Sequence, residues 1–375
     1  MAMPRSDSDW MRAALAMARR GLGRTWPNPA VGCVLVRDGR IVGRGHTSPG
    51  GRPHAETIAL AAAGSSAAGA TAYVTLEPCA HQGQTPPCAA ALIAASVARV
   101  VTAQTDPDPR VDGGGHAMLR AAGIAVTTGV CADEAADVNA GFLCRVHHGR
   151  PMITLKLATS LDGRIAMANG ESRWITGPDA RRRVHAMRAD HDAVLIGSGT
   201  ALADDPMLDI RGMGSLPNPV RVIFDSRLAI PTDARLVATA REIPTWIVHS
   251  ASAAASRRAA LEDAGVTCIS VAPAGSGRID PVSALRALGE RGLTRVFCEG
   301  GGTLAATLLE CDLVDRLALF TAGKTIGATG IPALGALELG ALVDTARFSL
   351  RSTSPVGADA LSQWTRSQWT RIQRQ

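Results

Sequence analysis

Aromatic side chains are scarce in this sequence: they make up only 3% of its 375 residues, with 5 Phe, 6 Trp and 1 Tyr. Proteins that bind single-stranded nucleic acids use aromatic rings as stacking platforms for the bases. The scarcity argues against such a binder, and it leaves Ala, Val, Leu and Ile to build the core. The net charge of +6 is modest and favours small anionic ligands, such as phosphates, over a dedicated nucleic-acid surface.

The chain also lacks a long apolar run. No stretch reaches the ~18 apolar residues that a membrane-spanning helix needs. The N-terminal segment contains acidic residues, and Arg12 interrupts the apolar stretch that a secretory leader would require. We therefore expect a cytoplasmic protein. Its 8 cysteines do not form a disulfide framework, so in a reducing compartment the neighbouring Cys79 and Cys88 are expected to bind a metal.

What the sequence does contain is enough apolar surface for two α/β domains. Hydrophobic residues make up 46% and charged residues 19%, which is ordinary globular usage. Helical and strand patterns alternate along both halves, which predicts α/β layers with a mostly parallel sheet in the first half. The polar segment 147–151, with Gly149 and Pro151, is the expected boundary between domains 1–147 and 151–375. The expected helices of the first half cover 9–21, 54–63, 89–96, 115–122 and 133–146. The expected strands are 31–36, 41–42, 70–76, 99–103 and 124–127, with a hairpin turn at Asp38 and Gly39 between the first two.

The strongest local signal is a candidate zinc site. Zinc-dependent deaminases carry H-x-E followed by P-C-x-x-C, in which the His and Cys residues hold the metal and the Glu shuttles protons. Here His54 and Glu56 are followed by Cys79 and Cys88, in the same order, although residues 80–87 separate the two cysteines. Two alternatives stay open: an ordinary helix start with buried cysteines, or a structural site in which His81 is a fourth ligand.

Upstream of this motif, Asn28 lies between Pro27 and Pro29. Proline fixes its own φ and restricts the residue before it, so the Asn amide is held in an extended backbone. An amide offers both donor and acceptor groups, which suits recognition of a pyrimidine edge. The alternative is a simple turn.

Two strand-to-glycine-to-helix transitions, at residues 193–200 and 296–303, stand out in the second half. Glycines let the backbone approach a ligand, and helix N-termini favour phosphate. Neither segment matches a dinucleotide fingerprint or a Walker A loop, so a structural turn is an equal alternative to a dinucleotide site. Arg188 could clamp a substrate phosphate with two hydrogen bonds, whereas Arg181, Arg182 and Arg183 are typical of a solvated helix face.

Together these motifs resemble one known family. T-x-P-N-P-x-V-G at 25–32, P-H-A-E at 53–56 and E-P-C-x-H-x-G-x-T-P-P-C at 77–88 are similar to the bifunctional riboflavin-biosynthesis deaminase/reductases, and the long cysteine spacing is that family's own form. The resemblance continues through K-L-A-x-S-L-D-G-R, E-S-x-W-I-T, A-D-D-P and E-G-G in the second half, and so covers nearly the whole chain. It implies a cytidine-deaminase-like three-layer domain followed by a dihydrofolate-reductase-like α/β domain.

The resemblance implies two successive reactions. Zn²⁺ would serve hydrolytic deamination of 2,5-diamino-6-(5-phosphoribosylamino)pyrimidin-4-one. NADPH would then reduce the ribosyl group of 5-amino-6-(5-phosphoribosylamino)uracil to ribityl. We accordingly expect a phosphoribosylated pyrimidine as substrate, no nucleic-acid or membrane partner, and a homo-oligomer. An RNA-modifying deaminase and a non-catalytic zinc protein are the competing functions.

Residue by residue, the resemblance implies the following roles. Zinc would be held by His54, Cys79 and Cys88, with Glu56 as the proton shuttle. The expected substrate positions, besides Asn28, are Ser172, Arg188, Leu208, Arg211 and Glu299. The expected NADPH positions are Ala158, Trp174, Thr200, Asp204, Ser226, Gly301, Gly302, Thr303, Leu304, Ala305, Ala306 and Thr307. Asp204 is also the candidate for proton transfer, unless it only hydrogen-bonds the cofactor. One departure is Thr47, which stands where the family often has a His, with His46 one place earlier.

Overall fold

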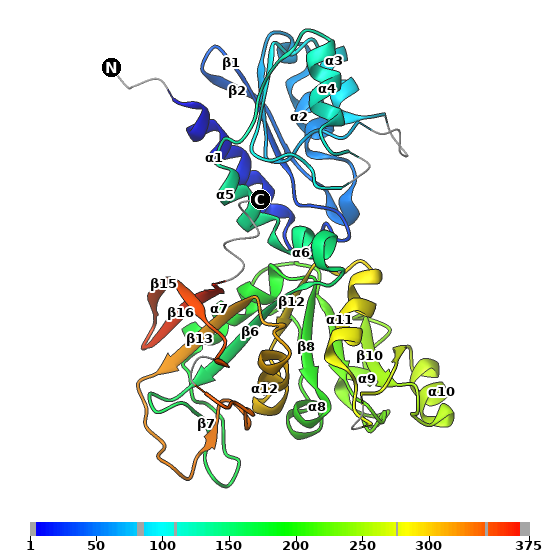
Figure 1. Ribbon diagram of the computed structural model, residues 1–375, viewed down its shortest axis with the longest axis vertical. Coiled ribbons are helices and arrows are strands. Elements are labelled where there is room, and N and C mark those ends of the chain that lie inside the picture. Colours follow the sequence, from blue (N-terminus) through cyan, green and yellow to red (C-terminus); the bar gives the residue numbers. More distant parts are fainter. Residues whose placement is uncertain (1–4, 81–85, 109–110, 275–276, 342–343, 368–375) are drawn as a thin grey trace. The chain divides into compact units, whose positions relative to one another are not determined.

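The computed structural model describes residues 5–80, 86–108, 111–274, 277–341 and 344–367. It divides into two compact units, residues 1–148 and 149–375 (Figure 1). Each unit is built around one main β-sheet.

The first unit is a five-stranded sheet in the order β2-β1-β3-β4-β5. Its strands are β1 (Gly32–Arg37), β2 (Arg40–His46), β3 (Thr71–Val74), β4 (Arg99–Thr102) and β5 (Ala125–Thr127). Its helices are α1 (Asp7–Ala18), α2 (Ala55–Ala63), α3 (Cys88–Ala94), α4 (Gly114–Ala121), α5 (Ala132–Val138) and α6 (Ala140–His148), with short 3₁₀ turns at Arg19–Gly21, Pro49–Gly51 and Gly64–Ala67.

Helices cover both faces of this sheet, which gives the three expected layers. Side chains of β1, β3 and β4 pack on one face against α2, α3 and α4, and on the other against α1 and α5 (Figure 1). The expectation of a mostly parallel sheet was wrong. β3 pairs with β4, and β4 with β5, in parallel, but β1 is antiparallel to both β2 and β3. The tight turn at Asp38 and Gly39, both with positive φ, makes β2 the antiparallel neighbour of β1.

The second unit contains a nine-stranded sheet in the order β11-β10-β9-β8-β12-β6-β13-β16-β15. These strands are β6 (Met152–Thr159), β8 (Ala193–Gly197), β9 (Val220–Phe224), β10 (Thr245–Ser250), β11 (Thr267–Val271), β12 (Arg295–Cys298), β13 (Arg316–Ala322), β15 (Phe348–Val356) and β16 (Asp359–Arg366); β7 (Arg164–Ala166) and β14 (Ile331–Pro332) form a separate pair. The helices are α7 (Pro178–Ala189), α8 (Ser198–Asp204), α9 (Arg235–Ala238), α10 (Ala255–Asp263), α11 (Pro281–Glu290) and α12 (Gly302–Glu310).

Parallel pairing runs from β11 to β13, and the hairpin of β15 and β16 then closes the sheet antiparallel. In parallel sheets the carboxyl ends of the strands lie at one edge, where ligands bind. The segments that follow β6, β8, β9 and β12 contain most of the positions expected to bind NADPH or substrate. The sheet thus gathers residues that lie far apart in the sequence.

Candidate active sites

The first site is a His-Cys-Cys cluster at the ends of three elements. His54 is the N-cap of α2, Cys79 follows β3, and Cys88 begins α3. The His54 Nδ1 atom lies 3.2 Å from Cys88 Sγ and 3.7 Å from Cys79 Sγ, and the Cys88 backbone N–H donates to Cys79 Sγ at 3.3 Å. One ligand atom from each residue lies within 4.8 Å of the others. Two sulfurs and one imidazole nitrogen in this arrangement fit a zinc ion that keeps a fourth position open.

Hydrogen bonds within this cluster shift the pKa values of its side chains. The side-chain hydrogen bond with Cys88, with a further one from His54, lowers the pKa of Cys79 to about 4, whereas the bond with Cys79 and burial raise the pKa of Cys88 well above its usual range. Glu56 lies in the first turn of α2 and is only 3% exposed. Burial raises the pKa of Glu56 to about 7, which suits a group that both takes up and releases protons near neutral pH.

The expected substrate residue Asn28 contacts the loop that leads to His54. Its Nδ2 atom donates to the Gly50 carbonyl at 3.3 Å. A Cβ atom on Gly51, which has φ +89°, would lie 2.0 Å from Asn28 Nδ2, so only glycine permits this close approach. Thr47 is 3% exposed and accepts the Val31 N–H at 3.0 Å. His46 Nδ1 lies 3.0 Å from the Thr47 carbonyl oxygen.

Replacing Cys88 with Ala is expected to lower the zinc content and abolish deamination, because three protein ligands leave none to spare. The matched control is Cys144→Ala, since Cys144 is also buried in the first unit but lies outside the cluster. Metal analysis of both purified variants checks the prediction. Full zinc occupancy in Cys88→Ala would contradict it and favour His81, which lies outside the described residues.

The second site contains a buried ion pair at the carboxyl edge of the nine-stranded sheet. Arg188, near the end of α7, donates from Nε and Nη2 to the two carboxylate oxygens of Glu299 at 2.6 and 3.2 Å. Its Nη1 atom also donates to the Asp209 carbonyl at 2.7 Å. Glu299 directly follows β12, and Leu208, with φ +54°, is 4% exposed in the same loop as Asp209. Arg211 forms an ion pair with Asp209 at 2.9 Å.

Four of the expected substrate residues therefore lie close together in the structure: Arg188, Leu208, Arg211 and Glu299. The fifth expected residue of the second unit, Ser172, is exposed.

The positions expected to bind NADPH lie on neighbouring strand ends. The Gly301 N–H donates to Thr200 Oγ1 at 3.1 Å, which joins the starts of α8 and α12. Ser226 follows β9 and accepts the Ile279 N–H at 3.1 Å. Ala158 is on β6. Asp204 ends α8 and is exposed. The remaining expected positions, Gly302, Thr303, Leu304, Ala305, Ala306 and Thr307, form the first two turns of α12.

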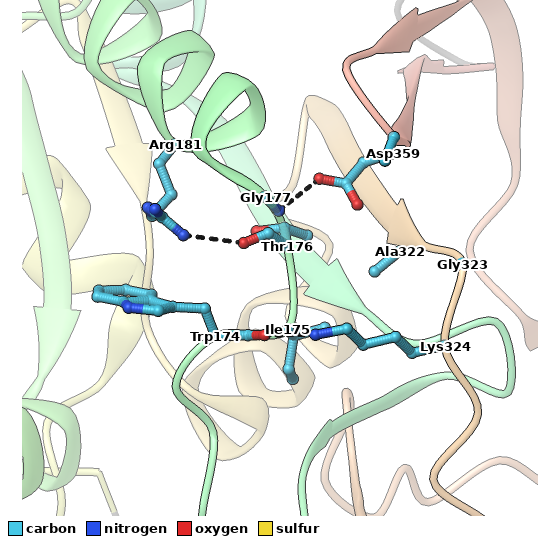
Figure 2. Close-up of a pocket in the computed structure, with 10 residues that line it drawn as sticks. Trp174, Ile175, Thr176, Gly177, Arg181, Ala322, Gly323, Lys324 and Asp359 are labelled. Carbon is cyan, nitrogen blue, oxygen red and sulfur yellow. Dashed lines mark hydrogen bonds between the residues drawn. The ribbon is translucent and has the colours of Figure 1, made fainter.

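Trp174 borders a cavity of about 400 Å³ beside the ends of β13 and β16 (Figure 2). Trp174 is 62% exposed, and the Arg181 guanidinium lies 4.5 Å from the centroid of its ring. Arg181 also donates to the Thr176 carbonyl at 3.1 Å, and Lys324 donates to the Trp174 carbonyl at 2.8 Å. Arg181 and Lys324 thus both hydrogen-bond the segment that carries Trp174. Arg181, which was expected on a solvated helix face, also contacts an aromatic ring.

Lys156 is a further residue of this site, and no sequence motif predicted a role for it. It lies on β6, on the same face as Ala158, because side chains alternate along a strand. Burial lowers the pKa of Lys156, although the nearby Glu299 carboxylate opposes this effect. The available sequence signal was a single lysine within the apolar segment 152–158. Its proximity to Glu299 arises from the pairing of β6 with β12.

Two family models match the chain. The cytidine and deoxycytidylate deaminase zinc-binding region matches residues 4–104, and the RibD C-terminal domain matches residues 151–361. The riboflavin biosynthesis protein RibD of Escherichia coli (strain K12) is 44% identical over 367 residues, covering 94% of this chain and 97% of that protein. The corresponding protein of Haemophilus influenzae is 42% identical over 370 residues, covering 94% and 95%.

Solved structures agree with these matches. An Acinetobacter baumannii RibD has a TM-score of 0.85 and 38% identity, covering 96% of this chain and 99% of that one. The Thermotoga maritima diaminohydroxyphosphoribosylaminopyrimidine deaminase/5-amino-6-(5-phosphoribosylamino)uracil reductase has a TM-score of 0.84 and 33% identity, covering 96% and 98%.

The fold and the sites define a zinc-dependent deaminase joined to a second α/β domain that matches the RibD C-terminal domain. More narrowly, the chain belongs to the RibD family of bifunctional deaminase/reductases in riboflavin biosynthesis. The expectations for the family, the fold class, the bifunctional enzyme and its zinc and NADPH cofactors are thus confirmed. Among the described residues, no helix has the length and hydrophobicity needed to cross a membrane.

Proposed function

We propose that residues 1–147 deaminate 2,5-diamino-6-(5-phosphoribosylamino)pyrimidin-4-one and that residues 151–375 reduce the resulting 5-amino-6-(5-phosphoribosylamino)uracil with NADPH. The observation that carries the proposal is the cluster of His54, Cys79 and Cys88 beside the buried Glu56, in a chain whose second half matches the RibD C-terminal domain. We further propose a cytoplasmic homo-oligomer that acts without a nucleic-acid partner.

In the deaminase site, each residue has a distinct role. His54, Cys79 and Cys88 would hold zinc, which when bound supplies activation of a water molecule for attack on the ring carbon that carries the amine. Glu56 takes a proton from that water and delivers a proton to the departing amine, so the C–N bond breaks as ammonia leaves and a carbonyl replaces it. The Asn28 amide orients the pyrimidine edge.

In the reductase site, the sugar ring opens to an imine before it is reduced. The imine carbon would accept a hydride from bound NADPH, and one proton on the imine nitrogen then gives the ribitylamino group. Arg188, Arg211 and Ser172 bind the phosphoribosyl group, while Glu299 holds Arg188 in place and keeps this cation oriented. Asp204 and Lys156 are both candidates for delivering the proton. Lys156 has the stronger physical case because it is partly buried on the same strand face as Ala158, and burial lowers its pKa below the usual lysine range.

The direct test incubates the purified full chain with the diaminopyrimidine ribotide, with and without NADPH, and identifies the products. Without NADPH, the expected product is the aminouracil ribotide together with ammonia. With NADPH, the ribityl compound should form as NADPH is consumed. Recovery of unchanged starting material under both conditions would contradict the proposed function.

Replacing Arg227 with Ala is expected to reduce the preference for NADPH over NADH. Arg227 is exposed and directly follows Ser226 at the end of β9, where its guanidinium can meet the 2′-phosphate of the cofactor. The measurement compares kcat/KM for the two cofactors in the variant and the parent protein. If the ratio of kcat/KM for NADPH to that for NADH is the same in both proteins, Arg227 does not determine the preference. Equal kcat/KM for the two cofactors in the parent protein would contradict the NADPH preference itself.

Replacing His185 with Ala is expected to raise the KM for the aminouracil ribotide about 5-fold, roughly the 1 kcal/mol of one hydrogen bond. His185 Nδ1 lies 3.1 Å from the Asp209 carbonyl oxygen and 3.2 Å from the Arg211 backbone nitrogen, so either tautomer of the ring hydrogen-bonds the 208–211 loop. His185→Asn, which places an acceptor near the position of Nδ1, should restore the KM. Equal KM values for the parent protein and His185→Ala would contradict this role.

A further inference from the structure

Glu77 is a buried carboxylate that the deamination chemistry described above does not use. Its side chain is 0% exposed, and it lies two residues before Cys79, directly before Pro78. Its Oε2 atom accepts the backbone N–H groups of Asp106 at 3.2 Å and Gly113 at 3.0 Å, and its Oε1 atom accepts that of His116 at 3.0 Å. A carboxylate is costly to bury unless donors satisfy it, and these three backbone donors come from one segment of the chain.

That segment leads into α4, whose first turn packs directly on the chain around Cys79. Gly113, with φ +83°, is the N-cap of α4, so Glu77 lies at the end of the helix that favours negative charge. A Cβ atom on Gly115 would lie 1.9 Å from the Pro78 carbonyl oxygen, and one on Gly114 would lie 3.3 Å from Ala80 Cβ. The helix therefore contacts the residues on both sides of Cys79.

His116 extends this arrangement to the neighbouring strand. It is 3% exposed, with Nδ1 3.7 Å from Glu77 Oε2 and Nε2 2.9 Å from the hydroxyl of Thr102 at the end of β4. Burial lowers the pKa of His116. Glu77 thus joins the ends of β3 and β4 to the start of α4, immediately beside one of the zinc ligands.

We propose that Glu77 is a positioning residue for the zinc site: by gathering these three N–H groups, it fixes α4 against Pro78 and so holds Cys79 in the geometry that the metal requires. Groups that orient metal ligands contribute strongly to affinity, and their loss typically weakens binding ~10–100-fold. The inference rests on the proposed function only for the identity of the metal.

The test uses Glu77→Gln in the full chain. Glu77 accepts N–H groups on both oxygens, so the amide of Gln must present its NH₂ group to at least one of these donors. The expected result is zinc binding weakened by ~10–100-fold in competition with a chelator. The thiolate-to-metal absorption bands of the Co²⁺-substituted variant should also shift, whereas reduction of supplied aminouracil ribotide should be unchanged.

Asp192→Asn is the matched control. Asp192 is also a buried carboxylate, and its Oδ2 atom accepts from Thr294 N, Thr294 Oγ1 and Arg295 N at 2.7, 2.7 and 2.9 Å, but it belongs to the second unit. This variant should bind zinc like the parent protein. If Glu77→Gln fails to fold, Glu77→Asp keeps the charge but shortens the side chain, and it should also weaken zinc binding.

Parental zinc affinity and an unchanged Co²⁺ spectrum in a folded Glu77 variant would overturn the proposal. Zinc affinity and the Co²⁺ spectrum both measure metal binding and not activity. Their outcome therefore does not depend on which pyrimidine the parent protein deaminates. Failure of the parent protein to deaminate the ribotide would instead count against the proposed function.

Discussion

Replacing Glu56 with Gln is expected to lower the rate of deamination by at least ~10²–10⁴-fold, the usual contribution of general acid/base catalysis. The amide keeps the shape of the side chain but can neither accept the proton of the attacking water nor return it to the leaving amine. Glu56 is not among the three clustered ligand residues, so zinc content should stay at the parental level. Ammonia release from the diaminopyrimidine ribotide measures the effect, and metal analysis of the same sample checks the zinc.

The reciprocal variant is Gly301→Val, at the turn before α12. A Cβ atom there would lie 3.4 Å from Thr200 Oγ1, and the larger valine side chain would occupy the strand end where the backbone is expected to meet the cofactor. This variant should deaminate normally and accumulate 5-amino-6-(5-phosphoribosylamino)uracil. Glu56→Gln should still reduce that compound when it is supplied with NADPH. Loss of both activities in either variant, with the fold intact by circular dichroism, would contradict a separation of the chemistry between 1–147 and 151–375.

The zinc cluster could be located from the sequence because each of its parts is local. His54 and Glu56 belong to one helix start, and both cysteines lie where a strand gives way to a helix. Their order was enough to predict that the fold would bring the three ligand residues together. Glu77 belongs to the quoted motif at 77–88, but its role could not be predicted, since its partners lie 29, 36 and 39 residues away and contribute only backbone N–H groups.

Long-range contacts also explain the errors in the predicted elements. The single helix expected at 133–146 is divided into α5 and α6 at Asn139. The Asn139 side chain accepts the Ala30 N–H at 3.0 Å, across 109 residues of sequence. Hydrophobic periodicity reports only which face of a segment is buried, so it cannot reveal such a break. The β15–β16 hairpin was missed for a related reason, because much of β15 is exposed and lacks a clear apolar alternation.

In the reductase site, Asp204 and Lys156 are the two candidates for the proton donor. Asp204 was selected because it lies within a motif, and it is exposed at the end of α8. Lys156 lies on β6 with Ala158, near Glu299, and burial lowers its pKa. A lysine whose pKa is lowered by burial releases its proton more readily than a solvated one. The position of Lys156 in the fold therefore favours it over Asp204 as the proton donor.

Lys156→Met is accordingly expected to reduce the rate of reduction by ~10²–10⁴-fold, while Asp204→Asn has a much smaller effect on kcat. Methionine keeps the length and apolar contacts of the lysine stem but cannot carry the proton. A lysine donates only in its protonated form, so kcat of the parent protein should fall as the pH rises through the lowered pKa of Lys156. The residual kcat of Lys156→Met should not show this decrease at high pH. The pH profile of kcat under saturating NADPH and aminouracil ribotide measures both effects. A large loss in Asp204→Asn together with a parental profile in Lys156→Met would reverse the assignment and identify Asp204 as the donor.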